Sequence, residues 1–227
     1  MCTLTWWRDS DGVLEVYFNR DELKTRPVAD PPAGFEANGR AFLSPRDPRG
    51  GGTWMLANEA GLVVCLLNKW EQEEVPAGGS RSRGRLVWNL AGLRSAEEVG
   101  NEMVDLKSYR GFTLVAFSRG GDRCFEWDGK ELTVGPVPPF LTSSSYRFDE
   151  VRAGRLQKFA RHGSGRDFHA SPGEPSSAYT VRMNRPDAQT WSRSQLRVSD
   201  RVSWRYLAEQ ANLAGDPEET VVALPLR

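Results

Sequence analysis

The sequence predicts an α+β fold in which antiparallel sheets carry helices on their outer faces. Short runs rich in β-branched and aromatic residues occur at both ends of the chain, and the middle changes to the spacing typical of helices. The strand runs are joined by hairpin-length turns, which favours antiparallel pairing over wound βαβ units. With 227 residues, 39% of them hydrophobic and 26% charged, the chain can bury a substantial core. We therefore expect a single domain over residues 1–227.

A hairpin is predicted at the N-terminal end. Residues 2–7 and 13–18 are β-prone runs, and Asp11-Gly12 stands between them. Asp-Gly is a strong signal for a tight turn, because glycine accepts the positive φ that the turn requires. A turn centred on residues 10 and 11 pairs positions whose numbers sum to 21 or 22. This places Cys2 opposite Asn19 or Arg20.

The boundaries of the next elements are predicted from the positions of proline and glycine, which interrupt strands and helices. Residues 24–52 are rich in both, which predicts a long surface loop, and strand character then resumes. Helical spacing follows a Gly/Ser/Arg loop at 76–85, and Ser95 with Glu98 resembles the capping box that begins a helix. The expected strands of this part are 53–57, 62–68, 112–117, 124–127 and 131–134.

The last third begins with a predicted helix at 151–161, built on Val151, Leu156 and Phe159 and ended by Gly163. A mobile loop is expected at 163–177, and His162 and His169 are expected to be an exposed pair rather than metal ligands. We expect no metal and no cofactor. The expected late strands are 178–183, 190–191, 195–198 and 202–207, with residues 221–224 in a polar tail.

Charge and hydropathy narrow the class of partner. Thirty basic and thirty acidic residues leave a net charge of +0, so the chain lacks the positive field that drives non-specific nucleic-acid binding. No stretch is long and apolar enough to cross a bilayer, and the first residues do not form a signal peptide. We expect a cytoplasmic protein that binds no nucleic acid and has no membrane span. Of its three cysteines, Cys65 and Cys124 have the surroundings of inert buried thiols.

The third cysteine, Cys2, is the candidate nucleophile. Initiator methionine is generally removed before a small second residue, which would make Cys2 the first residue of the chain. A terminal cysteine carries its own general base, because its α-amine titrates near ~7.7–8.0. The predicted hairpin brings Arg20 and Asp21 beside it. A guanidinium favours the thiolate, and a carboxylate can hold the α-amine by a hydrogen bond.

Several motifs of the sequence resemble those of one family. These motifs are Met1-Cys2, Asn19-Arg20-Asp21-Glu22, Arg26-Pro27, Gly51-Gly52-Thr53-Trp54, Leu67-Asn68, Ser82-Arg83-Gly84-Arg85-Leu86-Val87 and Tyr109-Arg110-Gly111-Phe112-Thr113-Leu114. Together they look like the signature of the NRDE family, also called the transport and Golgi organisation protein two family. That family is similar to N-terminal-nucleophile (Ntn) hydrolases of the choloylglycine hydrolase and penicillin V acylase kind, which fold as an αββα four-layer sandwich.

The resemblance implies roles for individual residues. Cys2 would be the nucleophile, Arg20 and Asp21 its neighbours, and Asn68 an oxyanion-hole donor. The candidate substrate-binding residues are Asn19, Gly52, Thr53 and Trp54. The chain departs from the family's pattern at 141–145, where hydroxyl side chains replace an amide donor.

Two functions remain open at this point. The first is an Ntn-type amidohydrolase or acyltransferase acting on linear C–N amide bonds of a small molecule. The second is a non-catalytic binding or trafficking protein for a hydrophobic ligand such as haem or an acyl lipid. A purely structural domain that binds another protein is a third, weaker alternative. Fold transfers between relatives more safely than function does.

Overall fold

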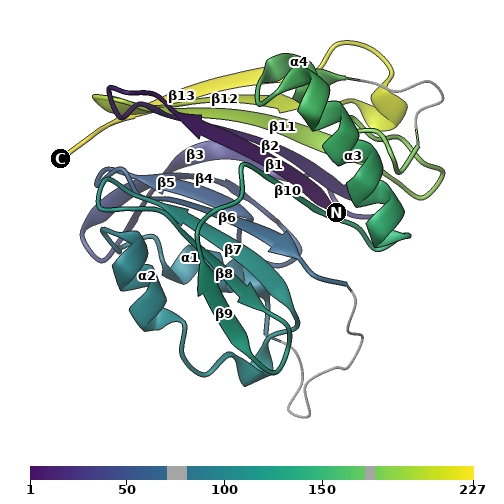
Figure 1. Cartoon of the computed structure of the whole chain (residues 1–227). Coiled ribbons are helices and arrows are strands. Elements are labelled where there is room, and N and C mark those ends of the chain that lie inside the picture. Colours follow the sequence, from purple (N-terminus) through teal and green to yellow (C-terminus); the bar gives the residue numbers. More distant parts are fainter. Residues whose placement is uncertain (71–80, 172–176) are drawn as a thin grey trace. The chain divides into compact units, whose positions relative to one another are not determined.

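The computed structural model describes residues 1–70, 81–171 and 177–227, which group into two compact units. The first unit is Met1–Val28, Pro139–Ser199 and Ser203–Val221, and the second is Ala29–Pro138, Asp200–Val202 and Val222–Arg227. Within these described ranges, thirteen strands form one six-stranded and one seven-stranded sheet (Figure 1). The strand pairs β1–β10, β1–β2, β2–β11 and each neighbouring pair of the seven-stranded sheet are antiparallel, so the predicted α+β class with antiparallel sheets is confirmed. The single-domain organisation stays a prediction.

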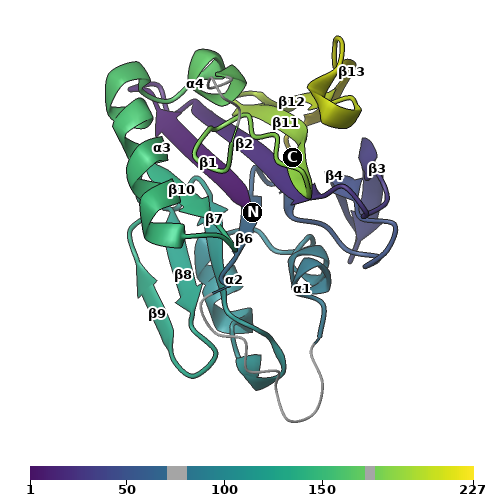
Figure 2. The same cartoon turned by 90° about the vertical axis from the view of Figure 1, so that its right-hand side faces the viewer.

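The first unit contains most of the six-stranded sheet, whose order is β10-β1-β2-β11-β12-β13. Helices α3 and α4 lie together along one face of this sheet and contact β10, β2 and β11 (Figures 1 and 2). The elements are β1 (Cys2–Arg8), β2 (Leu14–Leu23), β10 (Phe140–Ser143), α3 (Phe148–His162), α4 (Arg166–Ala170), β11 (Ala188–Val198), β12 (Arg201–Ala208), a short 3-10 turn (Ala211–Leu213) and β13 (Glu218–Pro225).

The N-terminal hairpin has one of the two predicted registers. Strands β1 and β2 pair so that position numbers sum to 22, and Cys2 lies opposite Arg20. Gly12 has a φ of 81°, a backbone conformation that glycine adopts without strain. The side chain of Asp9 accepts hydrogen bonds from the backbone N–H groups of Asp11 and Val13, which closes the turn. The local turn chemistry therefore fixes which residues of β2 stand beside Cys2.

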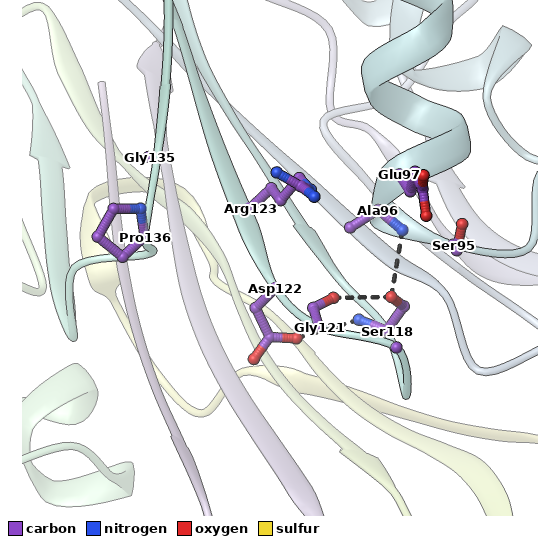
Figure 3. A pocket seen from close by; sticks show the side chains of 10 residues that line it. Ser95, Ala96, Glu97, Ser118, Gly121, Asp122, Arg123, Gly135 and Pro136 are labelled. Atoms are coloured by element: carbon purple, nitrogen blue, oxygen red, sulfur yellow. Dashed lines mark hydrogen bonds between the residues drawn. The ribbon is translucent and has the colours of Figure 1, made fainter.

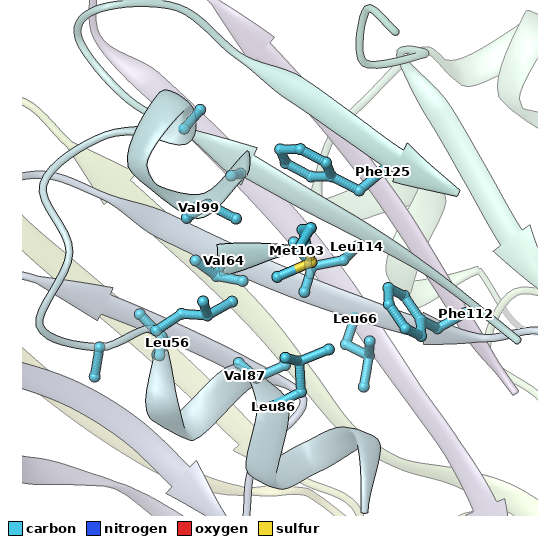
Figure 4. Close-up of a cluster of buried hydrophobic side chains, with 14 of the residues drawn as sticks. Leu56, Val64, Leu66, Leu86, Val87, Val99, Met103, Phe112, Leu114 and Phe125 are labelled. Atoms are coloured by element: carbon cyan, nitrogen blue, oxygen red, sulfur yellow. The ribbon is translucent and has the colours of Figure 1, made fainter. Parts of the chain in front are cut away.

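The second unit contains the seven-stranded sheet, in the order β3-β4-β5-β6-β7-β8-β9. Helices α1 and α2 pack their apolar sides on it, and Figure 4 shows the cluster in which Leu56, Val64, Leu86, Val87 and Val99 meet. The elements are β3 (Asp30–Ala37), β4 (Arg40–Arg46), β5 (Met55–Asn58), β6 (Val63–Asn68), α1 (Arg83–Asn89), α2 (Ala96–Glu102), a 3-10 turn (Leu106–Ser108), β7 (Phe112–Phe117), β8 (Arg123–Trp127) and β9 (Leu132–Gly135).

The prediction of a long loop at 24–52 is wrong. This segment contains strands β3 and β4, joined by a turn at Asn38 and Gly39, whose φ values of 52° and 71° suit a two-residue hairpin. Its prolines Pro31 and Pro32 lie on β3, at the edge of the sheet, where a register shift occurs between Asp30 and Ala33. An edge strand tolerates residues that donate no ladder hydrogen bond. The Asn-Gly pair was the overlooked hairpin signal.

Three other expectations are also corrected. The loop expected at 163–177 contains α4, and residues 172–176 of it lie outside the described residues, as do residues 76–80 of the loop expected at 76–85. The strand expected at 178–183 is a turn-rich segment in which the hydroxyl of Thr180 bonds the backbone of Ser177 and Arg182. In α3 Val151 is buried as expected, but Arg155 is also buried and Leu156 is exposed.

The helix starting at Ser95 is confirmed. The Ser95 hydroxyl accepts the backbone N–H of Glu98 at 3.1 Å, and the Glu98 carboxylate accepts the N–H of Arg94 at 2.6 Å. No described helix is long and apolar enough to span a membrane.

Candidate active site around Cys2

Cys2 lies on β1, which runs between β10 and β2 in the six-stranded sheet. It lies directly opposite Arg20 on β2 and opposite Ser143 on β10. Residues that oppose each other directly in an antiparallel sheet project from the same face. The backbone N–H of Cys2 donates to the hydroxyl oxygen of Ser143 at 3.0 Å. We call Ser143, Cys2 and Arg20 the Cys2 row; it brings together a thiol, a guanidinium and a hydroxyl.

The thiol of Cys2 is deeply buried in this form of the protein. Burial raises its pKa to about 11, because the protein interior disfavours the thiolate. The positive N-terminal group and the Arg20 guanidinium act in the opposite direction, and Asp21 and Glu22 add to the rise. Arg20 pairs with Glu22 at 3.4 Å. With Met1 attached, Cys2 is therefore a neutral thiol at physiological pH.

Met1 is held on the first unit by main-chain and side-chain contacts. Its ammonium donates to the carbonyl oxygen of Asp21 at 2.9 Å, and its own carbonyl accepts the Asp21 N–H at 2.8 Å. The Ser144 hydroxyl contacts the Met1 sulfur at 3.0 Å, and Met183 and Ala188 pack on it. While Met1 is present, the nitrogen of Cys2 is an amide and has no lone pair available for proton transfer.

The Asp21 carboxylate is bound on the helix-covered side of the sheet. One oxygen accepts from the Arg155 guanidinium of α3 at 3.1 Å, and the other accepts from the Thr190 hydroxyl at 2.7 Å. Both side chains of the Arg155–Asp21 pair are fully buried. Arg155 also donates to Thr3 and Thr142 hydroxyls and to the Ala178 carbonyl oxygen. The backbone of Asp21 is thus hydrogen-bonded to Met1, whereas its carboxylate links β2 to α3 through Arg155. The predicted role of that carboxylate at the α-amine stays a prediction.

Asn19 lies on the same helix-covered side. Its amide group donates to the carbonyl oxygens of His169 and Val181, each at 3.0 Å, and its oxygen bonds the His169 ring at 2.8 Å. The other ring nitrogen of His169 bonds the Thr5 hydroxyl at 2.8 Å. The expectation that His169 is exposed is wrong, because α4 places it on the sheet, where it is 3% exposed. His162 is exposed as expected.

The tetrapeptide Asn19-Arg20-Asp21-Glu22 therefore divides between two faces. Asn19 and Asp21 bond to residues of the helix side, whereas Arg20 lies in the Cys2 row and bonds Glu22. This alternation is the consequence of a strand's two-residue period. A single motif thus serves packing with its odd-numbered residues and the candidate site with its even-numbered ones.

The remaining predicted residues belong to the second unit. Asn68 ends β6 opposite Phe112 and is partly buried. Thr53 donates its N–H to the carbonyl of Gly84 and its hydroxyl to the carbonyl of Met55. Trp54 is a buried side chain next to them. Their roles in oxyanion and substrate binding stay predictions.

Gly52 has a packing role that predicts the effect of a substitution. A Cβ at Gly52 would lie 2.3 Å from the Gly84 carbonyl carbon and 2.5 Å from the Arg85 nitrogen, which are both backbone atoms. We expect Gly52→Ala to lower the free energy of unfolding by roughly 1–3 kcal/mol in urea titrations, because the start of α1 must shift. Gly34→Ala is the control, since no atom lies within 4 Å of its Cβ. Equal stability of both variants would contradict this reading.

A separate hollow of about 470 Å³ lies in the second unit, beside Ser118 and Asp122 (Figure 3). The Ser118 hydroxyl accepts the Ala96 N–H and donates to the Gly121 carbonyl, and Asp122 accepts the Ser118 N–H. These polar groups satisfy one another, and none of the predicted site residues lines the hollow. In the described part of the chain, no cluster of three or more His, Cys, Asp or Glu side chains suits a metal ion.

Arg155, His169 and Ser143 are residues near the candidate site that sequence reasoning missed. Arg155 had a usable signal, since it falls four residues after Val151 and four before Phe159, on the stripe that a helix buries. An arginine on such a stripe indicates a buried partner of opposite charge. Ser143 lies in the 141–145 segment whose hydroxyls replace the family's amide donor, but no local pattern placed it opposite Cys2, because β10 has only four residues. His169 had no such signal, because it lies in a glycine- and serine-rich segment.

Comparison with solved structures identifies the class of fold. A mutant of the conjugated bile acid hydrolase of Clostridium perfringens matches with a TM-score of 0.54 and 16% identity, covering 99% of this chain and 92% of that one. The Caenorhabditis elegans orthologue of N-acylethanolamine-hydrolyzing acid amidase matches with a TM-score of 0.60 and 12% identity, covering 86% and 92%. The chain thus has the fold of Ntn-type hydrolases, as predicted.

The sequence itself defines the family. The Transport and Golgi organisation 2 family matches residues 1–135, which is more than half of the chain. The protein belongs to this family, and the family resemblance found in its motifs is confirmed. A search of curated proteins found no match.

Proposed function

We propose that the protein is an N-terminal-cysteine amidohydrolase or acyltransferase that acts on linear C–N amide bonds of small molecules in the cytoplasm. The observation that carries this proposal is the Cys2 row, in which the sulfur-bearing residue has Arg20 on one side and the Ser143 hydroxyl at its nitrogen. The fold supports it, since a bile acid hydrolase and an acid amidase are among the solved proteins that share it.

Removal of Met1 converts the Cys2 nitrogen from an amide into an amine, whose pKa is ordinarily ~7.7–8.0. The neutral amine takes the thiol proton, and the sulfur attacks the substrate carbonyl carbon. The C–N bond then breaks, and the departing nitrogen receives that proton. Water, or an acceptor amine in the transferase case, attacks the thioester and restores the thiol. The Ser143 hydroxyl lies within hydrogen-bond distance of the same nitrogen, so it can orient the amine.

The other residues have supporting roles in this proposal. Arg20 favours the thiolate, because its positive charge lowers the pKa of the Cys2 thiol. Asn68 donates to the oxyanion, and Asn19, Gly52, Thr53 and Trp54 contribute to substrate binding. Asp21 holds β2 to α3 through its carboxylate, which accepts a hydrogen bond from the Arg155 guanidinium.

Alkylation followed by intact-mass measurement tests the nucleophile. Loss of Met1 opens the space that Met1 fills and admits water, which lowers the pKa of Cys2 from about 11. We expect a mass without Met1 and fast alkylation of Cys2 near neutral pH. Cys65 and Cys124 are internal controls, since both are buried and the pKa of Cys124 is raised to about 12. Retained Met1, or equal reactivity of all three thiols, would refute the mechanism.

Substitution of the nucleophile gives the second test. We expect Cys2→Ala to keep the fold and to reduce hydrolysis of any amide substrate at least a thousandfold, since no other nucleophile carries the α-amine. Cys65→Ala, on the buried strand β6, is the control and should retain turnover. Turnover by Cys2→Ala would exclude Cys2 as the nucleophile.

A second candidate is a non-catalytic carrier of a hydrophobic ligand such as haem or an acyl lipid. The observation that favours it is the buried neutral thiol, with a pKa of about 11 while Met1 is present. A carrier would show no turnover in the parent protein, and Cys2→Ala would change ligand retention alone.

A further inference from the structure

Two serines on β11 extend the Cys2 row across the sheet. Ser192 lies directly opposite Arg20, and Ser194 lies opposite Phe18 on the same face. Because Arg20 in turn opposes Cys2, four neighbouring strands present Ser143, Cys2, Arg20 and Ser192 in one line. All four residues belong to the first unit.

Both serine hydroxyls are buried and have no hydrogen-bond partner among the described residues. Ser192 is 1% and Ser194 4% exposed. Buried polar groups are almost always hydrogen-bonded in native proteins, so two unpartnered hydroxyls two residues apart on one strand call for an explanation. An incoming ligand that supplies the missing partner is such an explanation.

A third unpartnered group lies on the same face. Trp204 of β12 is fully buried, and its indole N–H has no partner in the described part of the chain. Its neighbour Arg205 lines a small hollow with Tyr17, His169 and Gln195 of the helix-covered side of the sheet, and Ser194 also borders this hollow. Since side chains alternate along a strand, Trp204 projects toward the side of Ser194.

We propose that Ser192, Ser194 and the Trp204 indole form a subsite for a carboxylate on the amide substrate, a proposal that rests on the proposed hydrolase function. The indole N–H can only donate, and each hydroxyl can donate. A carboxylate accepts several hydrogen bonds at once and gains from the positive charge of Arg20. Glu22 pairs with Arg20 at 3.4 Å and repels a carboxylate. It is two residues along β2 from the position opposite Ser192, roughly 7 Å, and four residues from the position opposite Ser194, roughly 13 Å, so the carboxylate is expected nearer Ser194.

The strand spacing sets the length of the substrate. Ser192 is two strands away from Cys2, which corresponds to about 10 Å between their backbones. A carboxylate in this subsite is therefore separated from the scissile carbonyl by a chain of several carbons. Adipoyl mono-p-nitroanilide, with a carboxylate at the end of a six-carbon chain, has this form. Hexanoyl p-nitroanilide is its neutral match of the same length.

The test compares these two anilides. We expect the parent to hydrolyse the adipoyl anilide with a kcat/KM at least tenfold above that of the hexanoyl anilide. Ser192→Ala should reduce this ratio on the order of tenfold, since a hydrogen bond to a charged group is lost. Gln195→Ala, three residues along the same strand but on the opposite face, should keep the ratio. Equal kcat/KM for both anilides in the parent would overturn the subsite.

Stability separates binding from a structural role. Ser192→Ala removes an unpartnered buried hydroxyl, so its Tm should equal or exceed that of the parent. A fall of several degrees together with the altered ratio would assign Ser192 a structural role and contradict the proposal.

Binding to the Cys2→Ala protein distinguishes failure of the subsite from failure of the proposed reaction. Calorimetry with the two anilides should show tighter binding of the adipoyl anilide, and this preference should disappear in Cys2→Ala/Ser192→Ala. If the parent hydrolyses neither anilide but this Ser192-dependent preference holds, the subsite stands and the proposed reaction falls. Absence of any preference in binding refutes the subsite.

Discussion

Arg155→Met is expected to lower the free energy of unfolding by about 3–5 kcal/mol, because it leaves the carboxylate of Asp21 buried without its cation. In the native protein the Arg155 guanidinium binds this carboxylate at 3.1 Å, and both side chains are fully buried. The same guanidinium reaches Thr3, Thr142 and the Ala178 carbonyl oxygen, so one side chain joins α3 to β1, β10 and the segment before β11. Urea unfolding measures the loss.

Two further variants make this expectation specific. Arg152→Met changes an exposed arginine of the same helix and should alter stability by less than about 0.5 kcal/mol. Arg155→Lys keeps the charge but loses the planar set of donors, so it should fall between the two. If Arg155→Met were as stable as Arg152→Met, the buried pair would contribute nothing, and another interaction would have to fix α3 on the sheet.

A loss of stability at mildly acidic pH is expected from His169. Burial, which is the largest cause, acts together with the positive charges of Arg193 and Arg155 to lower the pKa of this histidine to about 3. In the unfolded chain its pKa is ~6.5, so below this pH the unfolded state binds a proton that the folded state does not. The stabilisation is complete above pH 6.5 and is lost as the pH falls toward 3. Between pH 7 and pH 5 the loss is about 2 kcal/mol.

The comparison with His169→Gln isolates this contribution from that of the carboxylates. Glutamine does not titrate, so the difference in unfolding free energy between parent and variant should shrink from pH 7 to pH 5. His162→Gln, at the exposed end of α3, should keep the slope of the parent. A parent and a His169→Gln variant with parallel pH profiles would show that His169 takes up its proton in the folded state as well.

The fold could be predicted where local chemistry decides it. Asp11-Gly12 set the hairpin and its register, and Ser95 set the start of α2. The strands at 30–37 and 40–46 could not be recognised from composition, because their prolines are tolerated only on account of the edge position of β3 in the sheet. That position depends on pairing between distant segments, which a local pattern does not contain.

In the candidate site, too, the contacts set by local turns could be predicted, whereas those set by long-range pairing could not. The turn at Asp11-Gly12 predicts that Cys2 lies opposite Asn19 or Arg20, and in the structure it lies opposite Arg20. The positions of Ser143 and Ser192 in the site could not be predicted. Ser143 pairs with Cys2 and Ser192 pairs with Arg20, and each pair joins strands that are more than 120 residues apart in the chain. The location of His169 depends on α4, which begins in a segment whose glycines indicate a loop. Long-range pairing, rather than residue type, decides these positions.

The division of Asn19-Arg20-Asp21-Glu22 between two faces has a consequence for inherited or engineered sequence variation. Changes at Asn19 or Asp21 break buried hydrogen bonds to His169 and Arg155, so they should reduce the amount of protein that survives cellular quality control. Changes at Arg20 leave those bonds intact and should leave abundance near normal. Within four consecutive codons, loss of function would therefore arise by two routes, and only the variants of the first route could be rescued by a compound that stabilises the fold.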